Sequence, residues 1–219
     1  MFDSTRILSI ILSIPGILIA FTFHEYAHAF VADKLGDKTP KFQGRLTLNP
    51  IAHIDPIGFI LILILGFGWA KPVQTNPAAY KHYYKDDLKV SVAGPLANLA
   101  VGFVFAFITI ILSRVLTGNS PITVIIIMIA SITSRLNCML FLLNLLPIPG
   151  FDGFHILRDL FPRAFYNVAD SMYRYQLIIF MVLVFPIIGG HSVFDYIIGV
   201  PSNAIYSMFE GLALKVVGF

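Results

Sequence analysis

The chain has 219 residues, of which 57% are hydrophobic and only 12% are charged, and its mean hydropathy is +0.82. This composition excludes an ordinary soluble domain and predicts an all-α membrane protein that crosses the bilayer several times. The formal net charge is only +3, and the lysines lie in short loops between apolar runs, so the sequence predicts no nucleic-acid partner. Because Cys138 is the only cysteine, an intrachain disulfide and a site built from several thiolates are also excluded.

The first apolar run leads into a group of three ionisable residues. Residues 7–23 carry no charge and precede the sequence HEYAH at 24–28, inside a predicted helix over residues 5–32. His24 and His28 are one helical turn apart, so a helix places both imidazoles on one face, where they can bind one Zn²⁺. Glu25 can then act as a general base on the metal's water. Such a pattern inside a membrane segment predicts hydrolysis within the bilayer.

The second apolar run, residues 56–66, is too short to cross a bilayer as a helix, which takes about 20 residues. The next residues, 67–73, contain the glycine and proline that are typical of irregular backbone. We therefore expect residues 56–73 to form a re-entrant or interfacial segment. Backbone of this kind is tolerated at membrane depth only where protein or a water-filled cavity covers it.

Four further apolar runs follow, over residues 90–116, 122–146, 175–188 and 193–217. Together with the first run they predict about five to six spans at roughly 20 residues each. They leave no room for a separate soluble domain, so we expect one membrane domain over 1–219, with a core at 5–160 and C-terminal apolar helices at 175–217. If residues 56–66 do not cross, the three basic stretches at 33–55, 71–89 and 151–174 all fall on one side of the membrane. An excess of lysine and arginine marks the cytoplasmic side, so the two histidines lie near the cytoplasmic end of the first helix.

The third ligand of a catalytic zinc site must come from elsewhere in the chain. A downstream glutamate is nearly excluded because Glu210 is the only other glutamate, which leaves aspartates and the remaining histidines. Asp152 is the strongest candidate. It follows the predicted helix over 122–146, after the turn-forming sequence PIPG at 147–150, and that helix ends on the same side as His24 and His28. Asp152 could instead cap the end of a helix.

Several other polar residues allow more than one interpretation. His53 could stabilise charge near the metal or shape the loop that follows it. His155, three residues after the candidate aspartate, would lie beside the metal site or on the surface. Asn98 and Asn144 could be hydrogen-bonding residues of helix packing. Arg135 falls in the middle of the predicted helix over 122–146, where it would line a water path, pair with a carboxylate, or mark a misplaced span boundary.

Three motifs resemble the site-2 protease family of intramembrane zinc metalloproteases: HEYAH at 24–28, AGPLAN at 93–98 and NLLPIPGFDG at 144–153. The sequences GRLTLNP at 44–50, HIDPIG at 53–58 and GFGWAKPV at 66–73 resemble its compact bacterial and archaeal branch, without the PDZ or CBS domain of other branches. The resemblance implies one Zn²⁺ per chain, bound by His24, His28 and Asp152. It also implies that Glu25 is the general base and later the proton donor. Asn98 and Asn144 would hold the substrate strand or the oxyanion.

We therefore expect a zinc metalloendopeptidase that cuts transmembrane protein substrates in the plasma membrane of a prokaryote, with its active site towards the cytoplasm. The substrate must unwind locally, and residues 67–73 could pair with it as an added strand. The alternative is a non-proteolytic zinc transporter or scaffold. Glu25 favours the hydrolase, because a transporter has little need of a base between the ligands and would carry ionisable residues across its spans. The sequence sets no oligomeric state.

Overall fold

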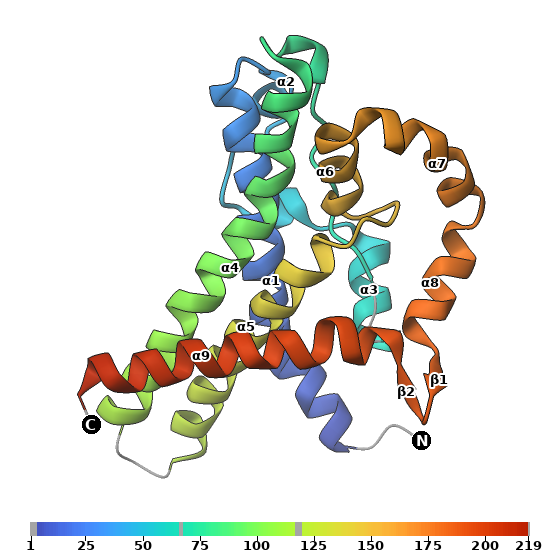
Figure 1. The fold of residues 1–219 in the computed structure, drawn as a ribbon. Coiled ribbons are helices and arrows are strands. Elements are labelled where there is room, and N and C mark those ends of the chain that lie inside the picture. Colours follow the sequence, from blue (N-terminus) through green and yellow to red (C-terminus); the bar gives the residue numbers. More distant parts are fainter. Residues whose placement is uncertain (1–3, 66–67, 117–119, 219) are drawn as a thin grey trace.

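Three long helices form the core of the computed structural model, which describes residues 4–65, 68–116 and 120–218 (Figure 1). They are α1 (Ser4–Lys34), α4 (Tyr83–Val115) and α5 (Pro121–Asn144), with 31, 33 and 24 residues. All three are long and apolar enough to cross a membrane, α1 over Thr5–Lys34. The described chain is helical apart from its loops and one small hairpin, so the predicted all-α class is confirmed.

The remaining elements are short and connect or flank the three long helices. They are α2 (Thr39–Phe42), η1 (Pro50–His53), α3 (Pro56–Leu65), η2 (Pro77–Ala79), α6 (Asp152–Leu160), α7 (Pro162–Arg174), α8 (Gln176–Val184), β1 (Pro186–Ile188), β2 (His191–Ser192), η3 (Asp195–Gly199) and α9 (Val200–Val217). β1 and β2 pair antiparallel. The loops around α2 lie at the end of the bundle where α1 ends and α4 begins, and α6 lies towards the same end (Figure 1).

The described helices support three spans, and the expected count of five to six is not confirmed. α8 has nine residues and is about 14 Å long, whereas the hydrocarbon core of a bilayer is about 30 Å thick. α9 has 18 residues and lies crosswise over α4 and α5 (Figure 1). One face of α9 is buried against these helices, at Ser202, Tyr206, Phe209 and Ala213. Of the C-terminal apolar runs, the one that forms α9 therefore packs across the long helices α4 and α5.

The segment over 56–73 contains a short helix and irregular backbone where the structure describes it, and its re-entrant or interfacial position stays a prediction. The ten-residue helix α3 is followed by extended backbone, in which Ala70 pairs with Ile54 in an isolated antiparallel bridge. The Lys71 N–H donates to the His53 carbonyl at 2.9 Å. Residues 66 and 67 lie outside the described residues. Residues 70 and 71 are thus tied to the preceding loop by backbone pairing.

Close backbone approach joins α4 to α5. A Cβ at Gly102 would lie 3.0 Å from Cys138 Sγ, which is tighter than an ordinary contact, so a larger residue would require a small shift of α5 or of Cys138. The Ser134 hydroxyl donates to the Gly102 carbonyl at 2.7 Å. Helices in lipid gain little from burying apolar surface, so tight packing and interhelical hydrogen bonds hold them together.

Arg135, the cation in the middle of α5, lies against α9. Its guanidinium carbon is 3.8 Å from the centroid of the Tyr206 ring, which is a cation–π contact. The Tyr206 hydroxyl donates to Glu210 at 3.0 Å. Arg135 therefore belongs to the contact between α5 and α9, with a carboxylate in the same cluster.

A buried ion-pair cluster holds α6 against α4. Arg158 of α6 pairs with Asp87 of α4 and, at 2.8 Å, with Asp159 of its own helix. Asp87 and Asp159 are only 4% and 8% exposed. Burial raises the pKa of Asp159 to about 6, although the Arg158 charge opposes the shift. Since α6 begins at Asp152, this cluster fixes the helix that carries the predicted third ligand.

We expect Arg158→Met to lower the free energy of unfolding by about 3–5 kcal/mol, because it leaves two buried carboxylates without their counter-ion. Reversible unfolding of the detergent-solubilised protein measures the change. Arg163→Met is the matched control, since Arg163 is an exposed arginine of α7, and its effect should stay within about 0.5 kcal/mol. Equal effects of the two substitutions would contradict a structural role for the cluster.

Candidate metal centre

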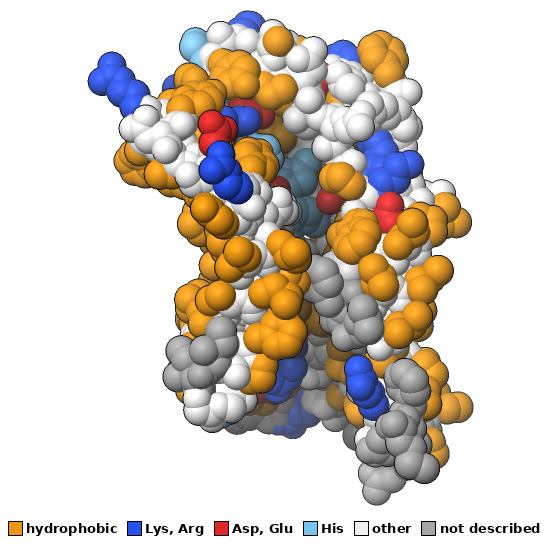
Figure 2. All heavy atoms as spheres, turned by 90° about the vertical axis from the view of Figure 1, so that its right-hand side faces the viewer, with side chains coloured by type: hydrophobic (Ala, Val, Ile, Leu, Met, Phe, Trp, Pro, Cys, Tyr) orange, Lys and Arg blue, Asp and Glu red, His pale blue; other side chains and the backbone are white. Residues whose placement is uncertain are grey.

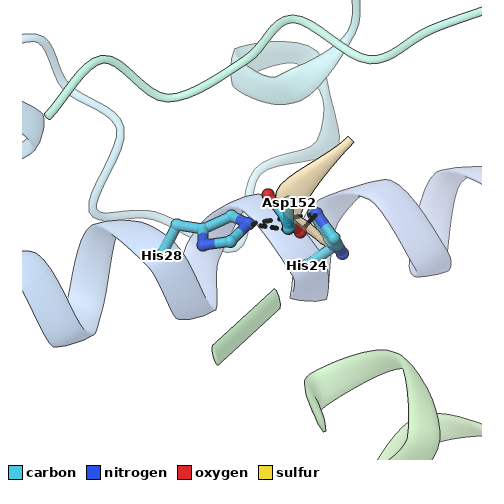
Figure 3. Close-up of side chains that lie close together, drawn as sticks. All are labelled: His24, His28 and Asp152. Carbon is cyan, nitrogen blue, oxygen red and sulfur yellow. Dashed lines mark hydrogen bonds and ion pairs between the residues drawn. The ribbon is translucent and has the colours of Figure 1, made fainter. Parts of the chain in front are cut away.

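Three potential ligands converge near the end of the bundle that carries the basic loops (Figure 3). His24 and His28 project from one face of α1, and Asp152 is the first residue of α6. The two Nε2 atoms are 3.1 Å apart, and they lie 3.2 and 3.3 Å from Asp152 Oδ2. The structure thus brings together the three residues that the sequence singled out. Their role as ligands stays a prediction.

The spacing of the three atoms fits a zinc ion. Two ligands at roughly 2.0–2.1 Å from a tetrahedral zinc ion lie about 3.4 Å from each other. The observed separations of 3.1 to 3.3 Å are close to this value. Asp152 Oδ2 is also buried without a hydrogen-bond partner among the described residues, which is costly for a carboxylate oxygen unless a cation binds it.

Hydrogen bonds fix the tautomer of both imidazoles. His24 Nδ1 lies 2.6 Å from Asn98 Oδ1, and His28 Nδ1 lies 2.7 Å from the Val90 carbonyl oxygen. Both oxygens can only accept, so each Nδ1 carries a proton and each Nε2 presents its lone pair to the centre. Contacts of this kind orient metal-binding histidines and make them better ligands.

Asn98 lies behind His24 and is fully buried. Its Nδ2 donates to the Ala20 carbonyl at 3.2 Å and to Asn137 Oδ1 at 2.9 Å, which uses both amide hydrogens. Asn98 therefore positions His24 and links α1, α4 and α5. This geometry favours a positioning role over the predicted contact with substrate or oxyanion. Asn137 is not among the residues that the sequence predicts for the site, although a polar amide in the middle of an apolar run indicates a buried hydrogen-bonding role.

Gly94 allows α4 to approach the two histidines. A Cβ at this position would overlap both imidazole rings. The glycine of the AGPLAN motif is therefore required by the space that the rings occupy. The same motif places Asn98 one helical turn further along α4, so one short sequence supplies both the space for His24 and its hydrogen-bond partner.

Glu25 lies beside the candidate ligands and is 6% exposed. Its Oε2 accepts the Val73 N–H at 2.7 Å and lies 3.8 Å from Nη2 of Arg45. Glu25 shares a cavity with His24 and Asp152. A carboxylate beside a metal, but outside the group that would bind it, is suited to accept a proton from water.

The cavity has a volume of about 1010 Å³, at the upper end of the range of roughly 300–1,000 Å³ for ligand pockets. Its walls are mostly apolar side chains from α1, α5 and α8, among them Ile10, Ile17, Phe21, Met139, Leu143 and Phe180. Figure 2 shows this side of the molecule hollowed between hydrophobic side chains. The polar residues of the site therefore lie at one end of an apolar cavity.

Comparison with known proteins identifies the family. The sequence profile of Peptidase family M50 matches residues 111–187. A Bacillus subtilis protein named "Putative zinc metalloprotease YwhC" is 39% identical over 200 residues, which cover 90% of each chain. The chain belongs to peptidase family M50, the site-2 protease family.

More distant relatives carry similar names. A Mycolicibacterium smegmatis protein, "Putative zinc metalloprotease Rip2", is 33% identical and covers 80% of this chain and 68% of its own length. A Methanocaldococcus jannaschii protein, "Putative zinc metalloprotease MJ0611", is 31% identical and covers 72% of this chain and 74% of its own. No solved structure matches the chain significantly.

Three predicted residues of this M50 chain lie around the centre without joining it. Asn144 lines the cavity and donates to the Leu140 carbonyl of its own helix at 3.0 Å. His53 is fully buried and its Nε2 lies 2.7 Å from the Thr47 carbonyl oxygen. Burial lowers the pKa of His53, so the ring is neutral and the loop role is favoured over charge stabilisation. His155 is exposed and lies outside the ligand group.

We expect Gly94→Ala to weaken zinc binding about 10- to 100-fold, because its methyl group would push both imidazoles out of line. Chelator competition on the purified protein measures this affinity. Gly211→Ala in α9 is the control, since a Cβ there meets nothing within 4 Å. Unchanged zinc affinity in Gly94→Ala would contradict the placement of the two rings.

We also expect Asn98→Ala to weaken zinc binding about 10- to 100-fold, because His24 loses the acceptor that fixes its tautomer. The exposed Asn203 of α9 provides the control substitution, Asn203→Ala. If Asn98 acted only on the substrate, Asn98→Ala would reduce cleavage and leave the zinc affinity at the wild-type value.

Proposed function

We propose that this protein is a zinc-dependent endoprotease that hydrolyses peptide bonds within or next to transmembrane segments of other proteins. One observation carries the proposal: His24, Asp152 and Glu25 line one cavity, whose walls are mostly apolar side chains of the membrane-length helices α1 and α5 and of α8. Such a cavity suits an apolar polypeptide better than a polar peptide arriving from water. The names of the relatives as zinc metalloproteases also support it.

The chemistry follows from the positions of the side chains. His24, His28 and Asp152 would hold one zinc ion per chain through two Nε2 atoms and one Oδ2. When bound, the ion would act as a Lewis acid and lower the pKa of a water molecule to about 7. Glu25 would accept a proton from the attacking water and later donate it to the leaving nitrogen. Asn144, on the cavity wall, would hydrogen-bond the substrate backbone or the developing oxyanion.

A substrate helix would have to unwind before attack, because its carbonyl groups are engaged in helical hydrogen bonds. Residues 70–73 lie next to Glu25, but the N–H groups of Lys71 and Val73 are already engaged and Pro72 has none, so an unwound segment could pair only with carbonyl groups that stay free there. Residue 67, the first of the segment expected to offer this edge, lies outside the described residues. The proposal therefore rests on the part from Ala70 to Val73.

We further propose that the whole chain is one membrane-embedded protease domain in the plasma membrane of a prokaryote. The loops around α2 and the start of α4, which contain Lys38, Lys41 and Lys85, lie at the end of the bundle towards which α6 also lies (Figure 1). An excess of lysine and arginine marks cytoplasmic loops. The active site would then lie towards the cytoplasm and release a cleavage product there.

The test combines zinc content and cleavage in the purified wild type and Glu25→Gln. A transmembrane peptide with a glycine- or proline-weakened helix serves as substrate. We expect about one zinc per chain in both proteins, as a three-ligand site predicts, and a loss of cleavage of at least about 100-fold in Glu25→Gln, the usual contribution of a general base. Glu210→Gln is the matched control, because Glu210 is the only other glutamate and lies in α9.

Each other outcome has a definite meaning. If both proteins hold zinc and neither cleaves substrates of graded helix stability, the transporter or scaffold becomes the better account. If neither protein holds zinc, the three-ligand centre is wrong. If Glu25→Gln cleaves like the wild type, Glu25 is not the base.

A further inference from the structure

Arg45 is an unusual cation in this chain. The protein has fifteen lysines and arginines, all within the described residues, and Arg45 alone among them is buried, at 4% exposure. From sequence it is one more basic residue of a loop that sets the membrane orientation. A residue with that function alone would remain in water, because burying a guanidinium group is costly unless it is paired.

The contacts of Arg45 join two parts of the active site. Its Nη2 donates to the Lys71 carbonyl and lies 3.8 Å from Glu25 Oε2. The Val73 N–H donates to the same Oε2 at 2.7 Å. Both side chains of the ion pair are under 10% exposed, at 5% for Arg45 and 8% for Glu25. One guanidinium group thus connects the Glu25 carboxylate to the extended backbone at 71–73.

The arrangement distinguishes the two oxygens of Glu25. Oε2 is held by the Val73 amide and by Arg45, whereas Oε1 has no hydrogen bond to the described residues. Glu25 lines the cavity beside His24 and Asp152. Fixing one oxygen of a carboxylate orients the other, and a displacement of about 1 Å in such a group can reduce a rate about 100-fold.

We propose that Arg45 is the positioning residue of the catalytic base: it holds Glu25 Oε2 and the Lys71 carbonyl together, and so sets the carboxylate and the substrate-facing backbone at 70–73 in one fixed arrangement. Arg45 acts through Glu25 and contacts none of the three candidate ligands. The inference deepens the proposed protease function and rests on it. It assigns a catalytic consequence to a loop residue outside the zinc motif.

The kinetic test compares Arg45→Met, Arg45→Lys and wild type with the peptide substrate described above. Methionine keeps the apolar part of the side chain and removes the charge. Lysine keeps the charge but lacks the planar guanidinium group. We expect about one zinc per chain in all three, and a kcat about 10- to 100-fold lower in Arg45→Met with a smaller change in KM. Arg45→Lys should recover part of the lost kcat. Lys41→Met is the matched control, because it removes an exposed charge from the same loop.

A thermal-unfolding cycle tests the contact between Arg45 and Glu25 without any substrate. Glu25→Gln leaves a buried cation without its carboxylate, so it should lower Tm. Adding Arg45→Met removes that cation and should restore part of the lost Tm, whereas independent sites would give additive losses. This cycle remains informative even if the wild type fails to cleave, an outcome that would count against the protease function itself.

Three results would overturn the inference. Arg45→Met could cleave with the wild-type kcat, which would mean that Glu25 needs no such partner. It could lose zinc or unfold, which would make Arg45 a structural residue of the loop. The Tm losses of Glu25→Gln and Arg45→Met could add, which would show that the two side chains do not interact.

Discussion

The buried amide of Asn98 is the interaction on which the geometry of the metal centre depends. It accepts from His24 and donates to Ala20 and Asn137, so one side chain connects α1, α4 and α5. An unpaired amide in apolar surroundings costs several kcal/mol, and helices in lipid have few other directional contacts. A shift or rotation of any one of these helices would break at least one of the bonds. The network therefore sets the register of the bundle and the orientation of His24 together.

A separate set of contacts positions Asp152 and His28. Asp152 begins α6, and an ion pair between Arg158 and Asp87 holds that helix against the start of α4. His28 is oriented by the Val90 carbonyl, also on α4. α4 thus holds both parts of the candidate centre, one through Asn98 and Val90 and the other through the ion-pair cluster. The helix that supplies none of the three ligands determines where all three meet.

Sequence reasoning identified the parts of the site that depend on local spacing. His24 and His28 share a face because a helix repeats every 3.6 residues, and the structure places them together with Asp152 as expected. Their function as ligands remains a prediction. The family resemblance gives Asn98 to the substrate or the oxyanion, and the sequence leaves helix packing open, because no local pattern shows that its amide meets His24 on another helix. Arg45 was not anticipated, since a basic loop residue resembles a topology signal until its burial is known.

The C-terminal region was harder for a related reason. Hydropathy over residues 175–217 predicts spans, but it does not indicate the direction in which a helix lies. The nine residues of α8 are too few to cross, and α9 turns across the bundle because one of its faces packs on α4 and α5. The packing of α9 across α5 also explains the position of Arg135, since Tyr206 of α9 lies against its guanidinium group. Both features depend on tertiary contacts between segments that are distant in the sequence.

The distribution of free polar atoms explains how a hydrolytic site can exist in an apolar cavity. The amide hydrogens of Asn98, both Nδ1 atoms and Glu25 Oε2 are all engaged within the protein. Among the described atoms of the candidate ligands and Glu25, those left without such a bond are the two Nε2 lone pairs, Asp152 Oδ2 and Glu25 Oε1. Water in an apolar cavity is stable only where several polar partners meet it. The bonds that orient the candidate ligands therefore also leave polar atoms at the point where water, a cation and a base would meet, as the proposed function requires.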